Sequence, residues 1–159
     1  KHFPARMRAG FTLLELVMVI VLIGILTFTA VPYLANIHTV GLDGAAKQVE
    51  SHIQYAQNLA VTTNDDHGFR TTSGVGGHTY EIYKVSSDTV VTSPYDHQPM
   101  QEDLSAEYLG VSFLSDVDVR FDKNGIPTFV SGASPVTLQN SDGEQKLITI
   151  NSAGSIRKQ

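Results

Sequence analysis

A run of 21 residues, from Phe11 to Val31, carries a single ionisable side chain, Glu15. At about 1.5 Å per residue, a helix of this length spans roughly 30 Å, the thickness of the hydrocarbon core of a bilayer. The preceding residues, Lys1 to Gly10, carry three cations and no acid, and such a flank favours the cytoplasmic side. The run therefore predicts a membrane-spanning helix with its N-terminus in the cytoplasm.

Three kinds of membrane segment share this pattern. A secretory signal peptide would be cut after the apolar run, at a small-residue site such as Thr-Phe-Thr-Ala-Val-Pro, residues 27–32. A plain anchor would not be cut, and a third kind loses only its basic leader on the cytoplasmic side. Glu15 favours the third kind, because a carboxylate within a membrane segment is costly and usually functional. Cleavage after Gly10 would create an amine at Phe11, four residues before Glu15, as a candidate partner.

The octapeptide Gly-Phe-Thr-Leu-Leu-Glu-Leu-Val, Gly10 to Val17, resembles the signature of type IV pilins and type II secretion pseudopilins. The resemblance implies that a prepilin peptidase cuts after Gly10 and that the new N-terminal Phe11 is N-methylated. It also implies that Glu15 meets the N-terminal amine of a neighbouring subunit during assembly. Because the sequence begins at Lys1 and not at Met, the leader either starts at Met7 or begins upstream of Lys1.

Gly24 and Pro32 fall where pilins commonly have Gly and Pro. Pro32 removes a backbone donor and clashes with the preceding turn, so we expect a helix kink there rather than an end. Gly24 weakens the helix locally, although membrane helices also tolerate both residues without functional consequence. Beyond Pro32 the helix becomes amphipathic, because apolar residues recur mostly at spacings of three and four. They are Leu34, Ile37, Ala45, Val49, Ile53, Ala56 and Ala60, and we expect Gly41 and Gly44 to make the start of this half loose.

The rest of the chain has the pattern of an antiparallel β domain. Turn sequences separate short strand-like segments at 78–86, 117–122, 126–130, 136–139, 146–151 and 155–158. Lys123-Asn124-Gly125 and residues 141–143 predict hairpins, and Pro127 places its strand at a sheet edge. Residues 94–101 are expected to form a loop, and 102–109 fit no single element.

The segment from Val119 to Gly125 and the later segment from Leu147 to Arg157 resemble the C-terminal domain of the GspH/FimT-like minor pilins. The fold class is therefore expected to be α+β: a long N-terminal helix packed on a small antiparallel sheet or β-sandwich. The expected domains are a leader at 1–10, a transmembrane half of the helix at 11–32, an amphipathic half at 33–64 and a β domain at 65–159.

The sequence carries no catalytic or metal-binding motif. It has no cysteine for a disulfide or a zinc site, and no nucleophile elbow, P-loop or dinucleotide fingerprint. His38 and His52 are too far apart along a helix to share a metal and are expected at the surface. The acidic stretch at 116–122, followed by Asn124 and Gly125, suggests a calcium loop, but its alternation with apolar residues favours a strand. We expect no enzymatic activity and no cofactor.

Without residues 1–10 the chain has 8 Lys and Arg against 16 Asp and Glu, a formal charge of −8. Such an acidic body binds polyanions poorly unless its cations cluster. Some FimT-like minor pilins are linked to DNA capture, and here Arg157 and Lys158, with Arg120 and Lys123 as possible neighbours, are the available phosphate contacts. The acidic charge therefore disfavours nucleic acid as a partner, and a DNA contact through Arg157 and Lys158 stays the alternative.

These observations and the resemblance together predict a structural subunit, a minor pilin or pseudopilin, of a type IV pilus or a type II secretion pseudopilus. A major pilin and a DNA-binding minor pilin are the alternatives. The expected partners are other pilin or pseudopilin subunits, the prepilin peptidase, the inner-membrane assembly platform and, before assembly, membrane lipid. The expected location is the inner membrane, in a single pass with the C-terminal domain in the periplasm, and then the filament.

Overall fold

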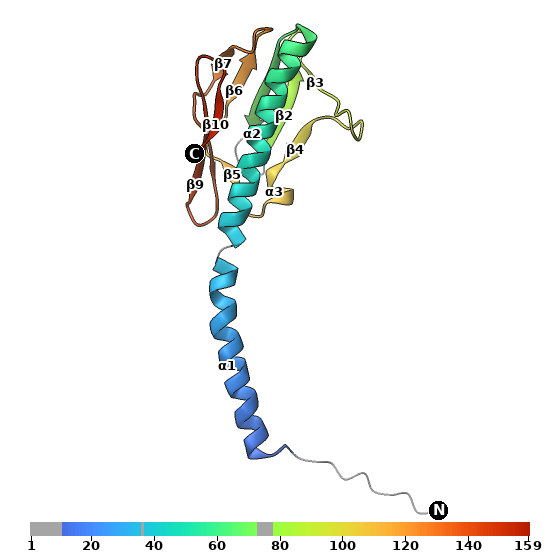
Figure 1. Cartoon of the computed structure of the whole chain (residues 1–159). Helices are drawn as coiled ribbons and strands as arrows, with labels where there is room; N and C mark the ends of the chain where they lie inside the picture. Colours follow the sequence, from blue (N-terminus) through green and yellow to red (C-terminus); the bar gives the residue numbers. More distant parts are fainter. Residues whose placement is uncertain (1–10, 36, 73–77) are drawn as a thin grey trace, which may run out of the picture. The chain divides into compact units, whose positions relative to one another are not determined.

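The computed structural model describes the backbone of residues 11–35, 37–72 and 78–159, and their side chains except those at 28–38. The chain divides into two compact units, Lys1–Ile37 and His38–Gln159. The first unit contains helix α1, Leu13–Ala35. The second contains helix α2, Ile37–Thr63, except for its first residue, the short helix α3, Leu104–Glu107, and all the strands of the described residues (Figure 1).

Helix α1 includes both Gly24 and Pro32, so the helix does not end at the proline. The side chain of Pro32 lies outside the described residues, and the kink expected at Gly24 and Pro32 stays a prediction. The apolar side chains from Leu13 to Leu26 are exposed around the whole helix. Within the described part of the chain, no helix combines the length and the apolar character needed to cross a membrane.

Helix α2 is amphipathic, as its residue spacing predicts. All the expected members from Ala45 onward are buried, and Leu42 and Ala46 are buried in addition. The buried face consists of Leu42, Ala45, Ala46, Val49, Ile53, Ala56 and Ala60. The expected members Leu34 and Ile37 lie outside the described side chains. The expectation of a loose start is wrong, because Gly41 and Gly44 lie inside a continuous helix. A Cβ on Gly44 would lie 3.0 Å from the ring of Tyr108, so the glycine lets that ring approach the helix.

Two antiparallel sheets make up the β domain. The six-stranded sheet has the order β3-β2-β1-β6-β7, with β4 also paired to β2. The four-stranded sheet has the order β10-β9-β8-β5. The strands of the first sheet are β1 (His67–Thr72), β2 (Thr79–Lys84), β3 (Thr89–Val90), β4 (Gln101–Asp103), β6 (Asp118–Phe121) and β7 (Pro127–Ser131). Those of the second are β5 (Ser112–Phe113), β8 (Val136–Gln139), β9 (Gln145–Ile150) and β10 (Ile156–Lys158).

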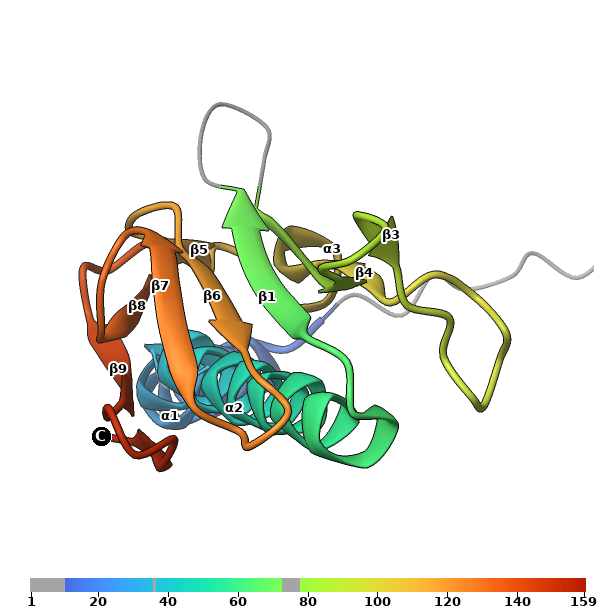
Figure 2. The ribbon, with the colours of Figure 1, turned by 90° about the horizontal axis from the view of Figure 1, so that it is seen from above.

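The two sheets and α2 enclose one hydrophobic core. Figure 2, seen from above, shows β1, β6 and β7 beside the helix and β8 and β9 to one side. Three aromatic residues connect the layers: Tyr80 of β2 lies 5.3 Å from Phe69 and 6.1 Å from Phe113, between ring centroids. Because each aromatic side chain buries roughly 150–250 Å², this cluster holds the large sheet and strand β5 of the small sheet together. The α+β fold class is confirmed.

The predicted hairpins are present. β6 pairs with β7 and β8 pairs with β9, and Gly125 and Gly143 take the positive φ angles, 77° and 84°, that these turns need. β7 is an edge strand, as Pro127 predicts. The strand-like segments expected from the sequence include neither β1, which begins at His67, nor β5.

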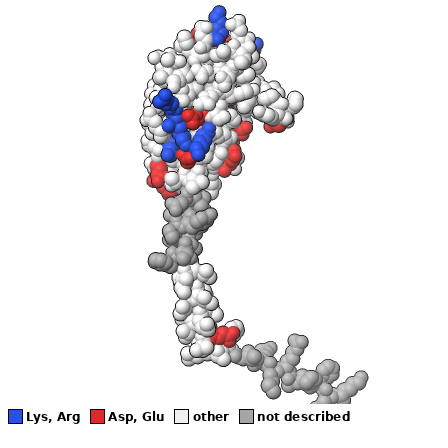
Figure 3. All heavy atoms as spheres, viewed as in Figure 1, with Lys and Arg blue, Asp and Glu red and all other residues white. Residues whose placement is uncertain are grey.

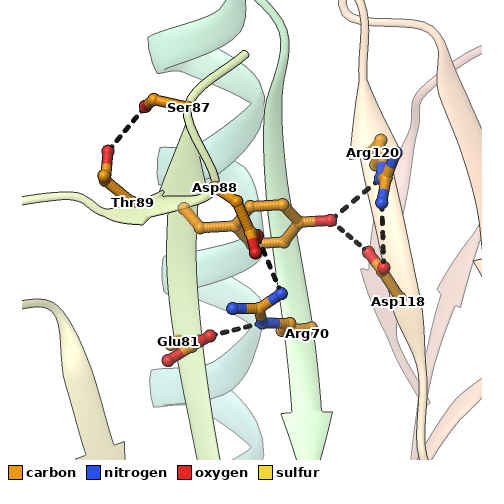
Figure 4. A network of polar contacts seen from close by, with 8 residues as sticks. Arg70, Glu81, Ser87, Asp88, Thr89, Asp118 and Arg120 are labelled. Atoms are coloured by element: carbon orange, nitrogen blue, oxygen red, sulfur yellow. Dashed lines mark hydrogen bonds and ion pairs between the residues drawn. The ribbon is translucent and has the colours of Figure 1, made fainter. Parts of the chain in front are cut away.

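The side chain of Tyr83 lies on the face of the large sheet that carries Arg70 and Arg120. The ring of Tyr83 lies across Gly68 of β1, where a Cβ would come within 2.5 Å of the ring. Its hydroxyl donates to Asp118 at 2.6 Å and accepts from Nε of Arg120 at 2.9 Å (Figure 4). The guanidinium of Arg70 lies 4.5 Å from the ring centroid. Burial, reinforced by the hydrogen bond to Asp118, raises the pKa of Tyr83 to about 12.

Candidate assembly segment

The first turn of α1 is capped by Thr12. Its hydroxyl accepts a hydrogen bond from the backbone N–H of Glu15 at 3.2 Å, and its carbonyl accepts from the N–H of Leu16 at 3.1 Å. A threonine at this position satisfies one of the free donors that every helix N-terminus presents. No role was predicted for Thr12 from the sequence, although Thr-x-x-Glu before an apolar run is the pattern of a capping box.

Glu15 occupies the third position of the helix that Thr12 caps. Its carboxylate has no ion-pair partner among the described residues. A negative charge in the first turn is favoured by the helix dipole, and α1 has no other acid in that turn. Phe11, two residues before the helix, is 79% exposed. Gly10, the predicted cleavage position, lies outside the described residues.

The start of α1 combines one charged side chain with an exposed apolar surface. Glu15 supplies charge near the helix start, and the exposed apolar side chains of Leu13, Leu16 and Ile20 supply surface that can pack against lipid or another helix. When such surface leaves water, its burial contributes about 25 cal/mol per Å² of favourable free energy. When the surface moves from lipid to another helix, the free-energy change depends on how well the side chains pack. The apolar surface can therefore pack against lipid or another helix, and the carboxylate adds a charge that a cationic neighbour could pair.

The two predicted DNA contacts, Arg157 and Lys158, project from opposite faces of β10. Lys158 points inward and donates from Nζ to Oδ1 of Asp43 at 2.6 Å, while Lys47 and Lys146 lie 3.0 and 3.8 Å from the same carboxylate. Hydrogen bonds from Lys158 and Lys47 lower the pKa of Asp43 to about 2. Figure 3 shows basic side chains gathered around carboxylates on the side of the domain that carries β9 and β10.

Arg157 is exposed and lines a shallow groove of about 270 Å³. The other two cations that the sequence analysis suggested as neighbours do not join it in that groove. Arg120 is on the large sheet, 3.5 Å from Asp118, and Lys123 is in the β6–β7 turn. The internal pairing of Lys158 leaves Arg157 as the cation of β10 that is available to an outside partner.

His52 is half-buried, so its predicted surface position is wrong. Its Nδ1 lies 2.7 Å from the hydroxyl of Tyr80, and its ring centroid lies 5.5 Å from that of Tyr80. Burial lowers the pKa of His52, against the opposing charge of Glu107. His38, the second histidine of that prediction, has its side chain outside the described residues.

The acidic stretch at 116–122 does not form a calcium loop in the described structure. Asp122 accepts hydrogen bonds from the N–H groups of Asn124 and Ile126, at 2.9 and 2.8 Å, and thereby shapes the β6–β7 turn. These bonds, foremost the one from Ile126, lower the pKa of Asp122. Among the residues described, no group of three or more His, Asp or Glu side chains is placed to hold a metal ion.

A cavity of about 310 Å³ lies between α2 and the chain that connects β3 to β4. Ser51, His52 and Tyr55 line it from the helix, and Met100 and Glu102 are among the residues on the other side. Burial, with the nearby charges of other carboxylates, raises the pKa of Glu102. Sequence reasoning missed this cavity, because its two walls are about 40 residues apart and neither carries a motif.

Models of known families match both the N-terminal segment and the β domain of the chain. Residues 5–31 match the model for the prokaryotic N-terminal methylation motif. Residues 45–154, more than half of the chain, match the model for the type II transport protein GspH. The N-terminal motif and the α+β fold define a pilin-like structural subunit of the type IV pilus and type II secretion class. Within that class, the chain belongs to the GspH family.

Individual relatives agree with this assignment. The pilin-like protein PilA1 of Thermus thermophilus is 28% identical over 166 residues, which cover 94% of this chain and 97% of that protein. The fold is similar to the type IV minor pilin FimU of Pseudomonas aeruginosa, with 19% identity, a TM-score of 0.51 and coverage of 74% and 92%. It is also similar to the minor pseudopilin EpsH of the Vibrio cholerae type 2 secretion system, with 14% identity, a TM-score of 0.54 and coverage of 74% and 95%. The resemblance to pilins and pseudopilins is confirmed, and the two structures show the shared fold.

Proposed function

We propose that this chain is a minor pilin or pseudopilin that is cut after Gly10 and enters a filament through α1. The chain first lies in the inner membrane with residues 11–32 spanning and the β domain in the periplasm. A prepilin peptidase removes the leader and N-methylates Phe11, and an assembly platform then extracts the subunit. The role is structural rather than catalytic.

One observation carries the proposal: Glu15 is a lone acid at the start of an apolar helix, without an ion-pair partner among the described residues. An unpaired charge costs about 2.5–3.5 kcal/mol at the centre of a membrane helix and less toward its ends, so a carboxylate in the first turn is still disfavoured in lipid. Pairing with the Phe11 amine of a neighbouring subunit would relieve much of this cost. The pair would also define the axial register, because the amine and the carboxylate meet at only one offset between adjacent helices.

Replacement of the charge tests the role of Glu15. Glu15→Gln keeps nearly the same shape and the hydrogen-bonding side chain but removes the charge, whereas Glu15→Asp keeps the charge. We expect Glu15→Gln to insert and be processed normally but to enter filaments about tenfold less well, the factor that corresponds to about 1.4 kcal/mol. Glu15→Asp should retain more incorporation than Glu15→Gln. The measurement is the ratio of subunit in sheared filaments to subunit in membranes, and an equal ratio for Glu15→Gln and the unaltered chain would contradict the proposal.

A further inference from the structure

The cavity between α2 and the chain that connects β3 to β4 has one wall that is held by its own backbone. This connection, residues 91–100, is a hairpin in which the N–H of Ser93 donates to the carbonyl of Gln98 at 2.8 Å. At its base, the N–H of Met100 donates to the carbonyl of Val91 at 2.7 Å. Figures 1 and 2 both show the hairpin extending beyond the sheet from β3 and β4. The cavity is therefore bounded by a helix on one side and by a backbone-paired hairpin on the other.

The lining of this cavity combines aromatic rings with carboxylates. Tyr55 lines it from α2 and Tyr95 from the hairpin, and Asp96 and Glu102 supply the carboxylates. Among the described residues that line it, none is a Lys or an Arg. The faces of aromatic rings and carboxylate groups both attract cations. The lining therefore fits a cationic group.

The negative charge at the cavity is not balanced from within the domain. In the described part of the chain, Asp96, Glu102 and the nearby Glu107 have no ion-pair partner. Burial and the charges of Glu107 and Asp96 raise the pKa of Glu102, so the three carboxylates are close enough to repel one another. His52 does not neutralise them, because burial lowers its pKa and leaves the ring uncharged at neutral pH. A cation in the cavity would offset this repulsion.

Another part of the fold already holds a guanidinium with the same kinds of group. The guanidinium of Arg70 lies 4.5 Å from the ring centroid of Tyr83 and pairs with Asp88 at 3.0 Å (Figure 4). It also donates to Glu81. One tyrosine and two carboxylates thus hold one arginine there, and the cavity offers two tyrosines and two carboxylates. Arginine fits such a set better than lysine, because its planar group both stacks on rings and bonds carboxylates in a fork.

The size and the charge of the molecule indicate where the cation comes from. The cavity holds about 310 Å³, at the lower end of the roughly 300–1,000 Å³ of small-molecule sites, and suits one long side chain. Tyr95, which is 94% exposed, adds at the rim an aromatic surface of the kind that protein partners bury. Without residues 1–10 the chain has a formal charge of −8, so two copies of it repel each other. A different protein is therefore the better source.

We propose that the cavity receives an arginine side chain from a different subunit of the same filament. The guanidinium lies against Tyr55 and Tyr95 and pairs with Asp96 and Glu102. The inference rests on the proposed function as a minor filament subunit. It specifies a surface through which the β domain meets a neighbour of another kind and the side chain that this neighbour presents.

Small arginine compounds test the chemistry of the cavity directly. The isotope-labelled full chain in detergent is titrated with Nα-acetyl-arginine amide and, in parallel, with Nα-acetyl-citrulline amide, which has nearly the same shape but no charge. The NMR signals of the backbone amides of Ser51, Tyr55 and Tyr95 report on the cavity. We expect these signals to shift with the arginine compound and the citrulline compound to bind at least about tenfold more weakly. Equal responses to the two compounds, or no shift at these signals, would overturn the inference.

Substitutions that remove charge locate the binding site. Asp96→Asn and Glu102→Gln keep the side-chain shape and should each weaken binding of the arginine compound about fivefold. Tyr95→Ala should also weaken it, because the exposed ring is lost. Asp66→Asn is the matched control, since it removes the same charge from an exposed position outside the cavity, and it should leave binding unchanged. A loss as large in Asp66→Asn as in Glu102→Gln would assign the effect to net charge and refute the site.

Photo-cross-linking in filaments tests the source of the arginine. The full chain, with p-benzoylphenylalanine in place of Pro94 at the cavity rim, is expressed in its host, irradiated in filaments and analysed by mass spectrometry. We expect a product with a different subunit, attached near an arginine of that subunit. Replacement of that arginine by glutamine should lower the yield as much as Glu102→Gln does. A product with another copy of this chain, or a yield that neither substitution changes, would contradict the inference.

The proposed function and the inference fail in different ways. Leader removal and incorporation are scored on the same filaments. Processed and incorporated subunits without a cross-linked product would overturn the inference and leave the proposed function intact. A chain that keeps its leader and never reaches filaments would contradict the proposed function, and the arginine subunit contact would fall with it.

Discussion

Gln57 of α2 donates from Nε2 to the carbonyl of Gly154 at 2.8 Å, across 97 residues of sequence. The same nitrogen donates to the carbonyl of Gly125, also at 2.8 Å. One amide group thus joins the helix to the turn of the β6–β7 hairpin and to the turn between β9 and β10. Since these two turns belong to different sheets, Gln57 connects all three layers of the domain at one end.

Loss of this connection should destabilise the β domain. Gln57→Ala leaves two partly enclosed carbonyls without their donor, and we expect the free energy of unfolding to fall by about 1–3 kcal/mol. The chain has no tryptophan, so urea unfolding of the detergent-solubilised full chain is followed by circular dichroism. Gln54→Ala is the matched control, because Gln54 is exposed one turn away, and its effect should stay within about 0.5 kcal/mol. Equal effects of the two variants would refute the role of Gln57.

A methyl group at position 68 should be poorly tolerated. Gly68→Ala would place a carbon 2.5 Å from the ring of Tyr83, and overpacking of this kind costs about 1–3 kcal/mol. Tyr83→Leu removes the ring that the methyl group would strike. In a double-mutant cycle measured by urea unfolding, Gly68→Ala should therefore cost less in the Tyr83→Leu background than in the unaltered chain. Additive effects would show that the ring is not the obstacle.

The His52–Tyr80 contact predicts a pH dependence of stability. Burial lowers the pKa of His52 in the folded chain below its ordinary value of 6.5, so the unfolded chain binds the proton more readily. The contribution of this group is therefore fully present above pH 6.5 and is lost as the pH falls through the lowered folded-state pKa. His52→Asn should flatten the fall in stability just below pH 6.5, as measured by urea unfolding at a series of pH values. An unchanged pH profile in His52→Asn would assign the dependence to other groups.

Features that depend on neighbouring residues were predictable from the sequence. The buried face of α2 follows from the three-and-four spacing of Ala45, Val49 and Ile53, because a helix places such residues on one side. The turn between β6 and β7 follows from Asn124-Gly125, and the edge position of β7 follows from Pro127, whose missing N–H is tolerated there. The role of Glu15 stays a prediction, since no partner chain is present to test it.

Features that depend on long-range pairing were not predictable. The two contacts of Gln57 connect positions 68 and 97 residues apart, and no local pattern distinguishes this glutamine from the exposed Gln54. The burial of His52 depends on the position of Tyr80 in β2, which only the folded sheet determines. Gly44 was interpreted as a weak point of the helix, whereas its lack of a side chain makes room for Tyr108. Thr12 was a local signal that the sequence analysis did not use.

The central claim is that the chain is cut after Gly10 and assembled through the helix that follows. N-terminal mass spectrometry of the protein isolated from membranes and from filaments tests it most directly. The account predicts that both forms begin at Phe11 and that this residue carries an N-methyl group. An intact leader in filaments, or a mature N-terminus beyond Ala30, would contradict the account.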